Sequence, residues 1–236
     1  YGLVPFSVIV GIVCGLIVQE PDLSTAALIA LVSYTLFFVA GADWRQFFFA
    51  VVVGGVVFIG LVAFFPHATA RWDAYKETLN NPEEAGYQIE QTLAALGRGR
   101  ITGVGLGNST QKFIPLPAAH TDGAFAIVAE EFGLIGSLSV MAVLGMLVWR
   151  GFLTAKRARD GYGALLAIGI TCWLGFQAML NIAVITAVIP FTGIPLPFIS
   201  YGGSAFAVSL VGAGILLNIS RDADLAMRPQ PQTKRT

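Results

Sequence analysis

The sequence is poor in charge. Only 12% of its 236 residues are Asp, Glu, Lys or Arg, whereas a soluble globular domain carries about 25%. The 14 basic and 14 acidic residues also cancel, so the chain lacks the basic character of a nucleic-acid binder. Hydrophobic residues make up 56% of it. This composition excludes a water-soluble globule and a disordered segment, and it predicts a membrane protein.

Cysteine is scarce as well. Cys14 and Cys172 each lie in an apolar stretch without metal-ligand spacing, which excludes a disulfide framework or a zinc site and favours simple burial. The sequence starts at Tyr1, with no charged segment ahead of its first apolar run. We therefore expect no signal peptide, and we expect the chain to begin partway through a longer protein.

Long apolar runs are what the sequence has in abundance. Six of them approach or exceed the roughly 20 residues that cross a hydrocarbon core. They cover residues 3–19, 24–41, 47–65, 133–149, 163–190 and 202–219. Each must be a helix, because an open strand in lipid would leave backbone groups unpaired. The sequence predicts an all-α polytopic bundle with six transmembrane helices, forming one membrane domain over residues 1–236.

The distribution of Lys and Arg predicts the orientation of the bundle, because short cytoplasmic loops are enriched in them. With both chain ends in the cytoplasm, the inner surface holds nine of the 14 basic residues: Arg45, Arg150, Lys156, Arg157, Arg159, Arg221, Arg228, Lys234 and Arg235. The other five fall within residues 66–132. We expect that interval to be a large external loop and residues 221–236 to be a polar cytoplasmic tail.

The interval 66–132 departs from the apolar composition and is the place to look for chemistry, since long loops in compact proteins are usually functional. Within it, GYQIEQTLAAL predicts a short amphipathic helix that lies on the membrane surface or re-enters the membrane. A run with Gly at 97, 99, 103, 105 and 107 follows. Its amides could converge on a phosphate flanked by Arg98, Arg100 and Lys112. The alternative is a flexible turn with solvated arginines.

Ionisable residues lie before and within the largely apolar segment GAFAIVAEEFG at 123–133. His120 and Asp122 precede it, and Glu130 and Glu131 lie inside it. Charged groups near membrane depth are costly and suggest function. If the segment is helical, one glutamate could share a cavity with Asp122. The alternatives are that Asp122 only caps the helix and that His120 is an ordinary hydrogen-bonded loop residue.

Two further polar features lie in the second half of the chain. Gln177 and Asn181 are four residues apart and so share one face of a helix. We expect them to form hydrogen bonds between helices or, alternatively, to line a substrate cavity. The segment IPFTGIPLPFISYGGS cannot be regular helix, so we expect it to pack in protein beside the Asp122 region.

Several segments together resemble the SEDS family of bacterial cell-shape, division and sporulation proteins, typified by RodA and FtsW. They are VQEPDLSTA at 18–26, GYQIEQTLAALGRG at 86–99, GVGLGNSTQK at 103–112, LPAAHTD at 116–122, EEFGLIG at 130–136, FQAMLNIA at 176–183 and TGIPLPFISYGGS at 192–204. They occur in collinear order over nearly the whole chain, and NSTQK and LPxxHTD resemble the FtsW branch more than the RodA branch.

The resemblance implies a fold of about ten transmembrane helices, of which about four are missing here. It also implies a peptidoglycan glycosyltransferase of the bacterial cytoplasmic membrane that polymerises lipid II beside a class B penicillin-binding protein, with Asp122 as the catalytic aspartate. Two departures concern the pocket: the family often has Glu where this chain has Ala118, and an aromatic residue where it has Gly123.

This reaction suits the residues present. Lipid pyrophosphate is a good leaving group, so one general base suffices, and we expect Asp122 to take the proton from the acceptor hydroxyl. Candidates to bind the departing diphosphate are Arg71, Arg98, Arg100 and Lys112. The resemblance also allows a divalent cation, Mg or Mn, with Asp122 as a metal contact instead. Glu130 or Glu131 would raise the pKa of Asp122 if it lay close. The competing functions are a flippase for lipid-linked precursors and a non-catalytic scaffold for the penicillin-binding protein.

Overall fold

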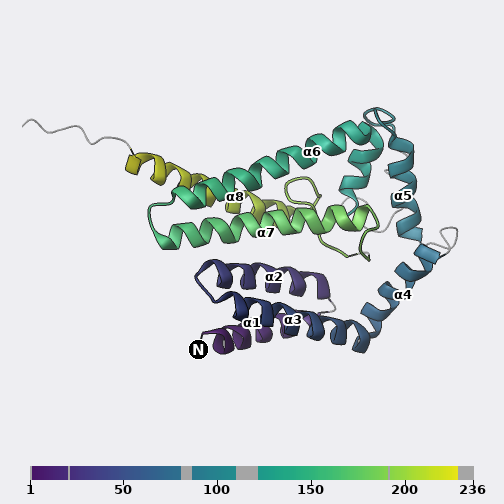
Figure 1. The fold of residues 1–236 in the computed structure, drawn as a ribbon. Coiled ribbons are helices and arrows are strands. Elements are labelled where there is room, and N and C mark those ends of the chain that lie inside the picture. The colour runs from purple at the N-terminus through teal and green to yellow at the C-terminus, as the bar shows by residue number, and fades with distance from the viewer. Residues whose placement is uncertain (1, 21, 81–86, 110–121, 191, 228–236) are drawn as a thin grey trace, which may run out of the picture.

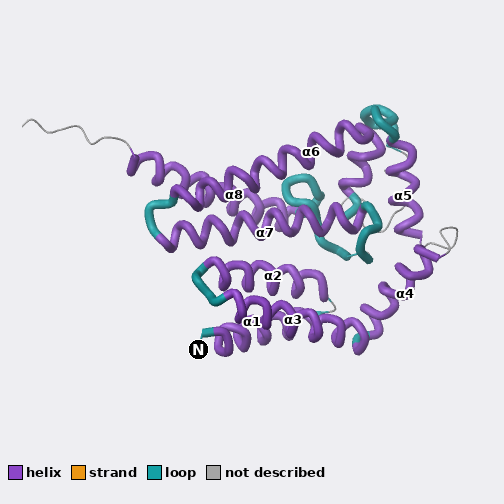
Figure 2. The backbone as a smooth tube through the Cα atoms, viewed as in Figure 1, coloured by secondary structure: helices purple, strands orange, loops and turns teal. Residues whose placement is uncertain are grey.

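The computed structural model describes residues 2–20, 22–80, 87–109, 122–190 and 192–227. Within these ranges every regular element is a helix, which confirms the predicted fold class (Figures 1 and 2). In chain order the helices are α1 (Leu3–Gln19), α2 (Leu23–Val39), α3 (Trp44–Phe64), α4 (Pro66–Asn80), α5 (Tyr87–Gly99), α6 (Ala124–Arg157), α7 (Gly161–Ile185) and α8 (Gly203–Met227).

Each of the six predicted apolar runs falls on one helix. Four of these helices, α3, α6, α7 and α8, are long and apolar enough to cross a membrane, and α1 and α2 are apolar helices of 17 residues each. The predicted helix over GYQIEQTLAAL is confirmed as part of α5, with a strongly amphipathic pattern. Helix α6 begins well before the predicted residue 133, and α8 extends beyond 219 to Met227. Residues 228–236 of the predicted tail lie outside the described residues.

Helices α1 to α3 form one group and α6 to α8 another, and α4 and α5 join the two groups at one end (Figure 1). The N-terminus and the last turns of α8 lie at the opposite end. The described parts of residues 66–132 are therefore gathered at the end away from both chain termini.

Acidic side chains fix where several helices start. Asp22 accepts a hydrogen bond from the backbone N–H of Thr25 at 3.0 Å, and Asp160 accepts one from Gly163 at 2.8 Å. These bonds satisfy N–H groups that lack a partner within the helix, each contributing about 1 kcal/mol. They fix the starts of α2 and α7, which follow the α1–α2 and α6–α7 turns.

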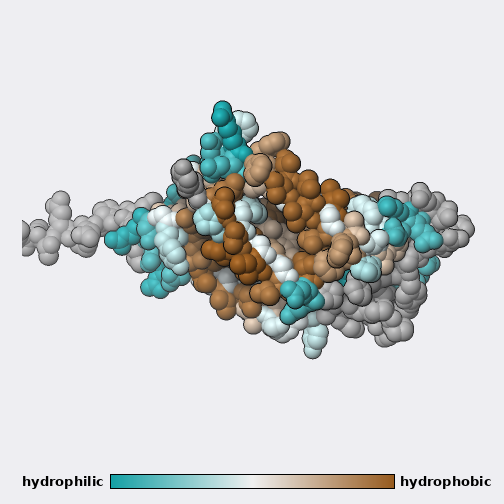
Figure 3. All heavy atoms as spheres, turned by 90° about the horizontal axis from the view of Figure 1, so that it is seen from below, coloured by the Kyte–Doolittle hydropathy of each residue, from teal (hydrophilic) through white to brown (hydrophobic). Residues whose placement is uncertain are grey.

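Small residues let the helices of the second group approach closely. A Cβ atom at Gly151 of α6 would lie 2.1 Å from Thr171 Oγ1 of α7, and one at Gly212 of α8 would lie 3.1 Å from the Trp173 ring. Close backbone approach of this kind is how membrane helices associate without a hydrophobic driving force. By contrast, only 6% of the most apolar window of α3 is buried. Figure 3 shows the corresponding apolar side chains across the middle of one face, as expected for lipid contact.

Helix α6 is broken at Gly133. This residue has φ 64° and ψ −158°, a conformation essentially restricted to glycine. The break divides α6 into a short first part, residues 124–132, which lies beside α5, and a long second part that crosses the bundle (Figure 1). We call the first part the half-helix.

The loop after α5 supplies the hydrogen bonds that the break removes. In an unbroken helix the carbonyls of residues 130 and 131 would accept from the N–H groups of 134 and 135. Here those carbonyls accept from Val104 and Gly105 at 3.0 and 3.1 Å. The freed N–H groups of Leu134 and Ile135 donate to the carbonyls of Arg100 and Ile101 at 2.9 and 3.2 Å. Residues 100–105 are thus inserted into the helix ladder, and all four exposed groups are paired.

Gly133→Ala is expected to destabilise the protein strongly. The new Cβ would lie 2.4 Å from Gly103 N and 2.6 Å from the Ile101 carbonyl, and the positive φ alone costs about 1–3 kcal/mol. Gly145→Ala, in the same helix with nothing within 4 Å of its Cβ position, is the matched control. The measurement is the midpoint of thermal unfolding in detergent, monitored as the loss of the monodisperse peak in size-exclusion chromatography after heating. Equal midpoints for both variants would show that the backbone at 133 is not constrained as described.

Candidate functional site

Asp122 lies in the turn immediately before the half-helix and is partly exposed. Gly123, rather than Asp122, is the N-cap residue of that helix. One carboxylate oxygen of Asp122, Oδ2, lies 3.3 Å from the position that a Cβ atom would take at Gly193. The expectation that the segment after α7 packs beside Asp122 is confirmed. Gly193 leaves the carboxylate room that any larger residue would fill.

Two amides of α7 hold this arrangement. Asn181 Nδ2 donates to the main-chain carbonyls of Asp122 at 2.9 Å and Ile194 at 2.8 Å, and Gln177 Nε2 donates to the Pro195 carbonyl at 2.8 Å. Both side chains are buried. Both amides are hydrogen-bonded, but these acceptors lie in the turn before the half-helix and in the loop after α7, not on a neighbouring helix as predicted. A role of either residue in lining a substrate cavity stays a prediction. Asn181 is the residue that ties the Asp122 backbone to that loop.

Two buried polar atoms beside Asp122 have no hydrogen-bond partner within the part of the chain that the structure describes. They are Asn181 Oδ1 and Thr192 Oγ1. An unpaired buried polar atom costs about 1–3 kcal/mol. Such atoms mark places where a water molecule or a ligand group completes the structure.

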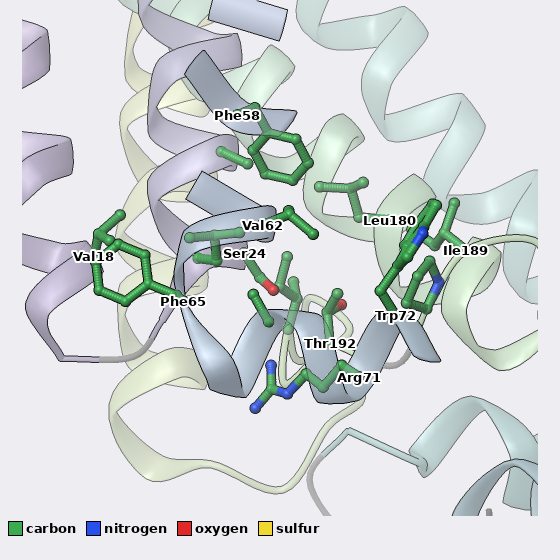
Figure 4. A pocket seen from close by; sticks show the side chains of 15 residues that line it. Val18, Ser24, Phe58, Val62, Phe65, Arg71, Trp72, Leu180, Ile189 and Thr192 are labelled. Carbon is green, nitrogen blue, oxygen red and sulfur yellow. The ribbon is translucent and has the colours of Figure 1, made fainter. Parts of the chain in front are cut away.

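A mainly apolar cavity of about 330 Å³ lies between the two helix groups (Figure 4). Thr192 and Ile194 line it, and Gly193 between them contacts Asp122. Arg71 lies at one edge, next to Trp72, and Phe58 at the opposite edge. The remaining lining residues are Val18, Leu23, Ser24, Ala27, Val62, Phe65, Ala68, Leu180, Ile189 and Pro190. Among the cation candidates that the structure describes, Arg71 is the one that lines this cavity together with Thr192 and Ile194.

Glu130 and Glu131 contact α5 and the glycine-rich loop. Glu130 Oε1 lies 3.6 Å from Arg98 Nη1, its Oε2 accepts from Ser109 Oγ at 2.5 Å, and Glu131 Oε1 accepts from the Gly107 N–H at 3.1 Å. Glu130 is eight residues beyond Asp122, about 12 Å along a helix axis. These contacts lie at the other end of the half-helix and give no support to a cavity shared with Asp122.

The described glycines do not form a free phosphate cradle. The N–H groups of Gly103 and Gly105 donate to main-chain carbonyls, and that of Gly107 donates to the Glu131 carboxylate. Arg100 is exposed, with its carbonyl paired to Leu134. Lys112 and His120, the two other predicted substrate-binding residues, lie outside the described residues, as does Ala118.

A divalent cation is the cofactor that the family resemblance allows. Within the described ranges, no group of three or more His, Cys, Asp or Glu side chains comes together. A divalent cation at this site stays a prediction, and the proposed mechanism passes no step through one.

Sequence reasoning missed several residues of this region. Ser109, Gly193 and Thr192 are small residues in segments that resemble no regular element, and Trp72 lies on α4, which the sequence did not single out. One available signal was Gly133, an isolated glycine inside a run otherwise fit for a helix, which often marks a packing or functional constraint.

The fold and site define a class: a polytopic membrane protein with an acidic residue at the start of a broken helix, next to an apolar cavity with a cationic edge. The model of the FtsW/RodA/SpoVE family, described as "Cell cycle protein", matches residues 1–225. The chain belongs to this family.

Curated relatives agree. The chain is 42% identical over 220 residues to stage V sporulation protein E of Bacillus subtilis, covering 93% of this chain and 60% of that one. It is 41% identical over 217 residues to the probable peptidoglycan glycosyltransferase FtsW of Pseudoalteromonas translucida, covering 91% and 54%. The chain therefore spans little more than half the length of these relatives.

Solved structures give the same fold. A chain from a peptidoglycan synthase complex, described as coordinating polymerization and crosslinking, superposes with a TM-score of 0.72 at 25% identity, covering 92% of this chain and 61% of that one. The rod-shape-determining protein RodA of Thermus thermophilus superposes with a TM-score of 0.61, also at 25% identity, covering 93% and 56%.

Asn181→Leu is expected to lower the unfolding midpoint clearly. The two carbonyls that Asn181 pairs would be left without their donor, at about 1–3 kcal/mol for each buried group. Asn218→Leu, at an exposed position on α8, is the control for the same chemical change. Thermal unfolding in detergent measures both variants. An Asn181→Leu midpoint equal to that of the control would mean that the amide does not hold the Asp122 turn.

Proposed function

We propose that this chain carries the polymerising site of a peptidoglycan glycosyltransferase, in which Asp122 activates a sugar hydroxyl of lipid II or of the growing glycan. The observation that carries the proposal is the placement of Asp122 just before the half-helix and beside Gly193. The two sequence neighbours of Gly193, Thr192 and Ile194, line the apolar cavity. The relatives named as probable peptidoglycan glycosyltransferases support the same activity.

The chemical step is a glycosyl transfer. Asp122 accepts the proton of the acceptor hydroxyl, and the oxygen of that hydroxyl attacks the anomeric carbon of the donor. The bond from that carbon to the lipid diphosphate breaks, and the diphosphate leaves with the electron pair. General-base assistance of this kind contributes about 10²–10⁴-fold to the rate. Diphosphate is a good leaving group, so a second carboxylic acid is not required.

The surroundings of Asp122 suit a lipid-linked sugar. The cavity offers mainly apolar side chains for part of an isoprenoid chain, and Arg71 at its edge offers a cation for the diphosphate. Asn181 Oδ1 and Thr192 Oγ1, which are unpaired among the described residues, are suited to bind sugar hydroxyls. Arg100, Lys112 and His120 remain proposed substrate contacts from the same loop interval.

The orientation and the partner belong to the same proposal. The end of the bundle that holds α4, α5 and Asp122 would face outward, where lipid-linked precursors are polymerised, since the Lys and Arg distribution places both chain termini inside. A class B penicillin-binding protein is the proposed partner. The structural similarity to a chain of a peptidoglycan synthase complex supports it.

Asp122→Asn is expected to abolish polymerisation while leaving the protein folded, because the amide cannot accept the proton. The measurement is formation of glycan polymer from fluorescent lipid II by the purified full-length protein with its penicillin-binding protein. Asp160→Asn is the control, since it lies at the other end of α7 and Asn caps a helix as well as Asp. Polymer formed by Asp122→Asn at the wild-type rate would refute the proposal. Labelled lipid crossing vesicles without polymer would indicate a flippase instead.

Arg71→Gln is expected to raise the KM for lipid II by about 10- to 100-fold, the value of a charge-assisted hydrogen bond of about 1.5–3 kcal/mol. The kcat should change less, because the cation already contacts the diphosphate in the ground state. Arg150→Gln, an exposed arginine near the opposite end of the bundle, is the matched control. Initial rates at varied lipid II concentrations separate the two constants. An unchanged KM would remove Arg71 from the diphosphate site.

A further inference from the structure

Glu130 is an ionisable residue in an unusual position. Its side chain is 1% exposed, and it lies near the end of the half-helix that starts beside Asp122. Burying a carboxylate without partners is very costly, so buried carboxylates are paired and hydrogen-bonded. Arg98 and Ser109 are two partners of the Glu130 carboxylate. Neither belongs to α6.

These two partners flank the inserted loop. Arg98 precedes residues 100–105, which complete the broken helix ladder, and Ser109 follows them. One carboxylate therefore binds the chain on both sides of the insertion, with Arg98 on one oxygen and Ser109 on the other. The Glu130 carbonyl also accepts from Val104 inside the loop. Glu130 thus contacts the loop before, within and after its inserted part.

The loop in turn fixes the half-helix. A Cβ atom at Gly99 would lie 2.0 Å from the Ala129 carbonyl, and one at Gly103 would lie 2.0 Å from the Glu131 carbonyl. Backbone in such close contact leaves no space for the half-helix to slide or rotate. The far end of the half-helix is fixed by Asn181, which donates to the Asp122 carbonyl. The position of Asp122 therefore depends on both attachments.

We propose that Glu130 is a positioning residue for Asp122. By holding Arg98 and Ser109, it keeps the loop inserted, and the inserted loop sets the axis of the half-helix that presents the carboxylate. This inference rests on the proposed glycosyltransferase function and adds a residue that touches neither sugar nor diphosphate. A displacement of about 1 Å in a reacting group can cost about 10²-fold in rate.

The test compares four variants of the full-length protein: Glu130→Gln, Ser109→Ala, the double variant, and Glu90→Gln as the control. Glu90 is an exposed carboxylate on α5, so it carries the same change without the contacts. We expect Glu130→Gln to lower kcat for lipid II polymerisation by about 10- to 100-fold with the KM within about twofold. The double variant should cost little more than Glu130→Gln alone, because residues acting as a unit are not additive.

A second measurement separates positioning from a loss of folded protein. Fewer folded molecules lower the rate equally at every pH, whereas a displaced Asp122 has new surroundings and a shifted pH–rate profile. We expect the half-maximal pH of kcat/KM to move by at least about half a unit in Glu130→Gln and to stay in place in Glu90→Gln. A profile of unchanged shape would overturn the positioning role.

Hydrogen–deuterium exchange supplies a readout that does not depend on catalysis. In Glu130→Gln the peptides covering residues 99–109 and 122–132 should exchange faster, with α7 unchanged. Exchange equal to wild type would overturn the proposal at the level of structure. If Glu130→Gln exchanges faster than wild type in these peptides but the wild-type protein makes no polymer, the proposed function fails and the attachment of the loop by Glu130 still stands.

Discussion

The structure depends on the pairing of main-chain groups at the break in α6. An unbroken helix satisfies its own N–H and C=O groups, and a break leaves several of them without partners, which is costly wherever they are removed from water. The loop after α5 provides two donors and two acceptors in the positions that the helix vacates. Because the loop replaces these hydrogen bonds, the half-helix can run in a different direction from the long second part of α6. Without the change in direction, Asp122 would not face the loop after α7.

Glycine is required at the break and in the loop for one shared reason. Main chain of the loop must approach main chain of α6 closely enough to form hydrogen bonds along both edges, and a Cβ atom at Gly99, Gly103 or Gly133 would occupy that space. Charged side chains add to this backbone contact. Glu130 and Glu131 direct their carboxylates to the same loop that their carbonyls already bind. Backbone and side chains of two adjacent residues therefore stabilise one contact.

Much of the fold was predictable from hydropathy, because a helix in lipid needs a long apolar run and little else. The six runs, the amphipathic α5 and the packing of the 190s beside Asp122 were all predicted. The break at Gly133 was not, since glycine also occurs within intact membrane helices, as at Gly145. The contacts of Glu130 were also not predictable, because helical spacing gives a residue's direction on its own helix but not which distant loop it meets. The proximity of Arg71 to the Asp122 region required the tertiary arrangement of α4 and α7.

Tyr75 illustrates the same dependence elsewhere. Its hydroxyl, on α4, contacts the carbonyls of Ala187 at 3.3 Å and Val188 at 2.8 Å just past the end of α7, where Ala187 has a positive φ of 54°. Both this helix end and the break in α6 are completed by segments that come earlier in the chain. During synthesis those earlier segments leave the ribosome before the helices that they complete. The later helices then reach their final shape only after meeting them, so we expect the last folding step to be the docking of the two halves rather than the insertion of any single helix.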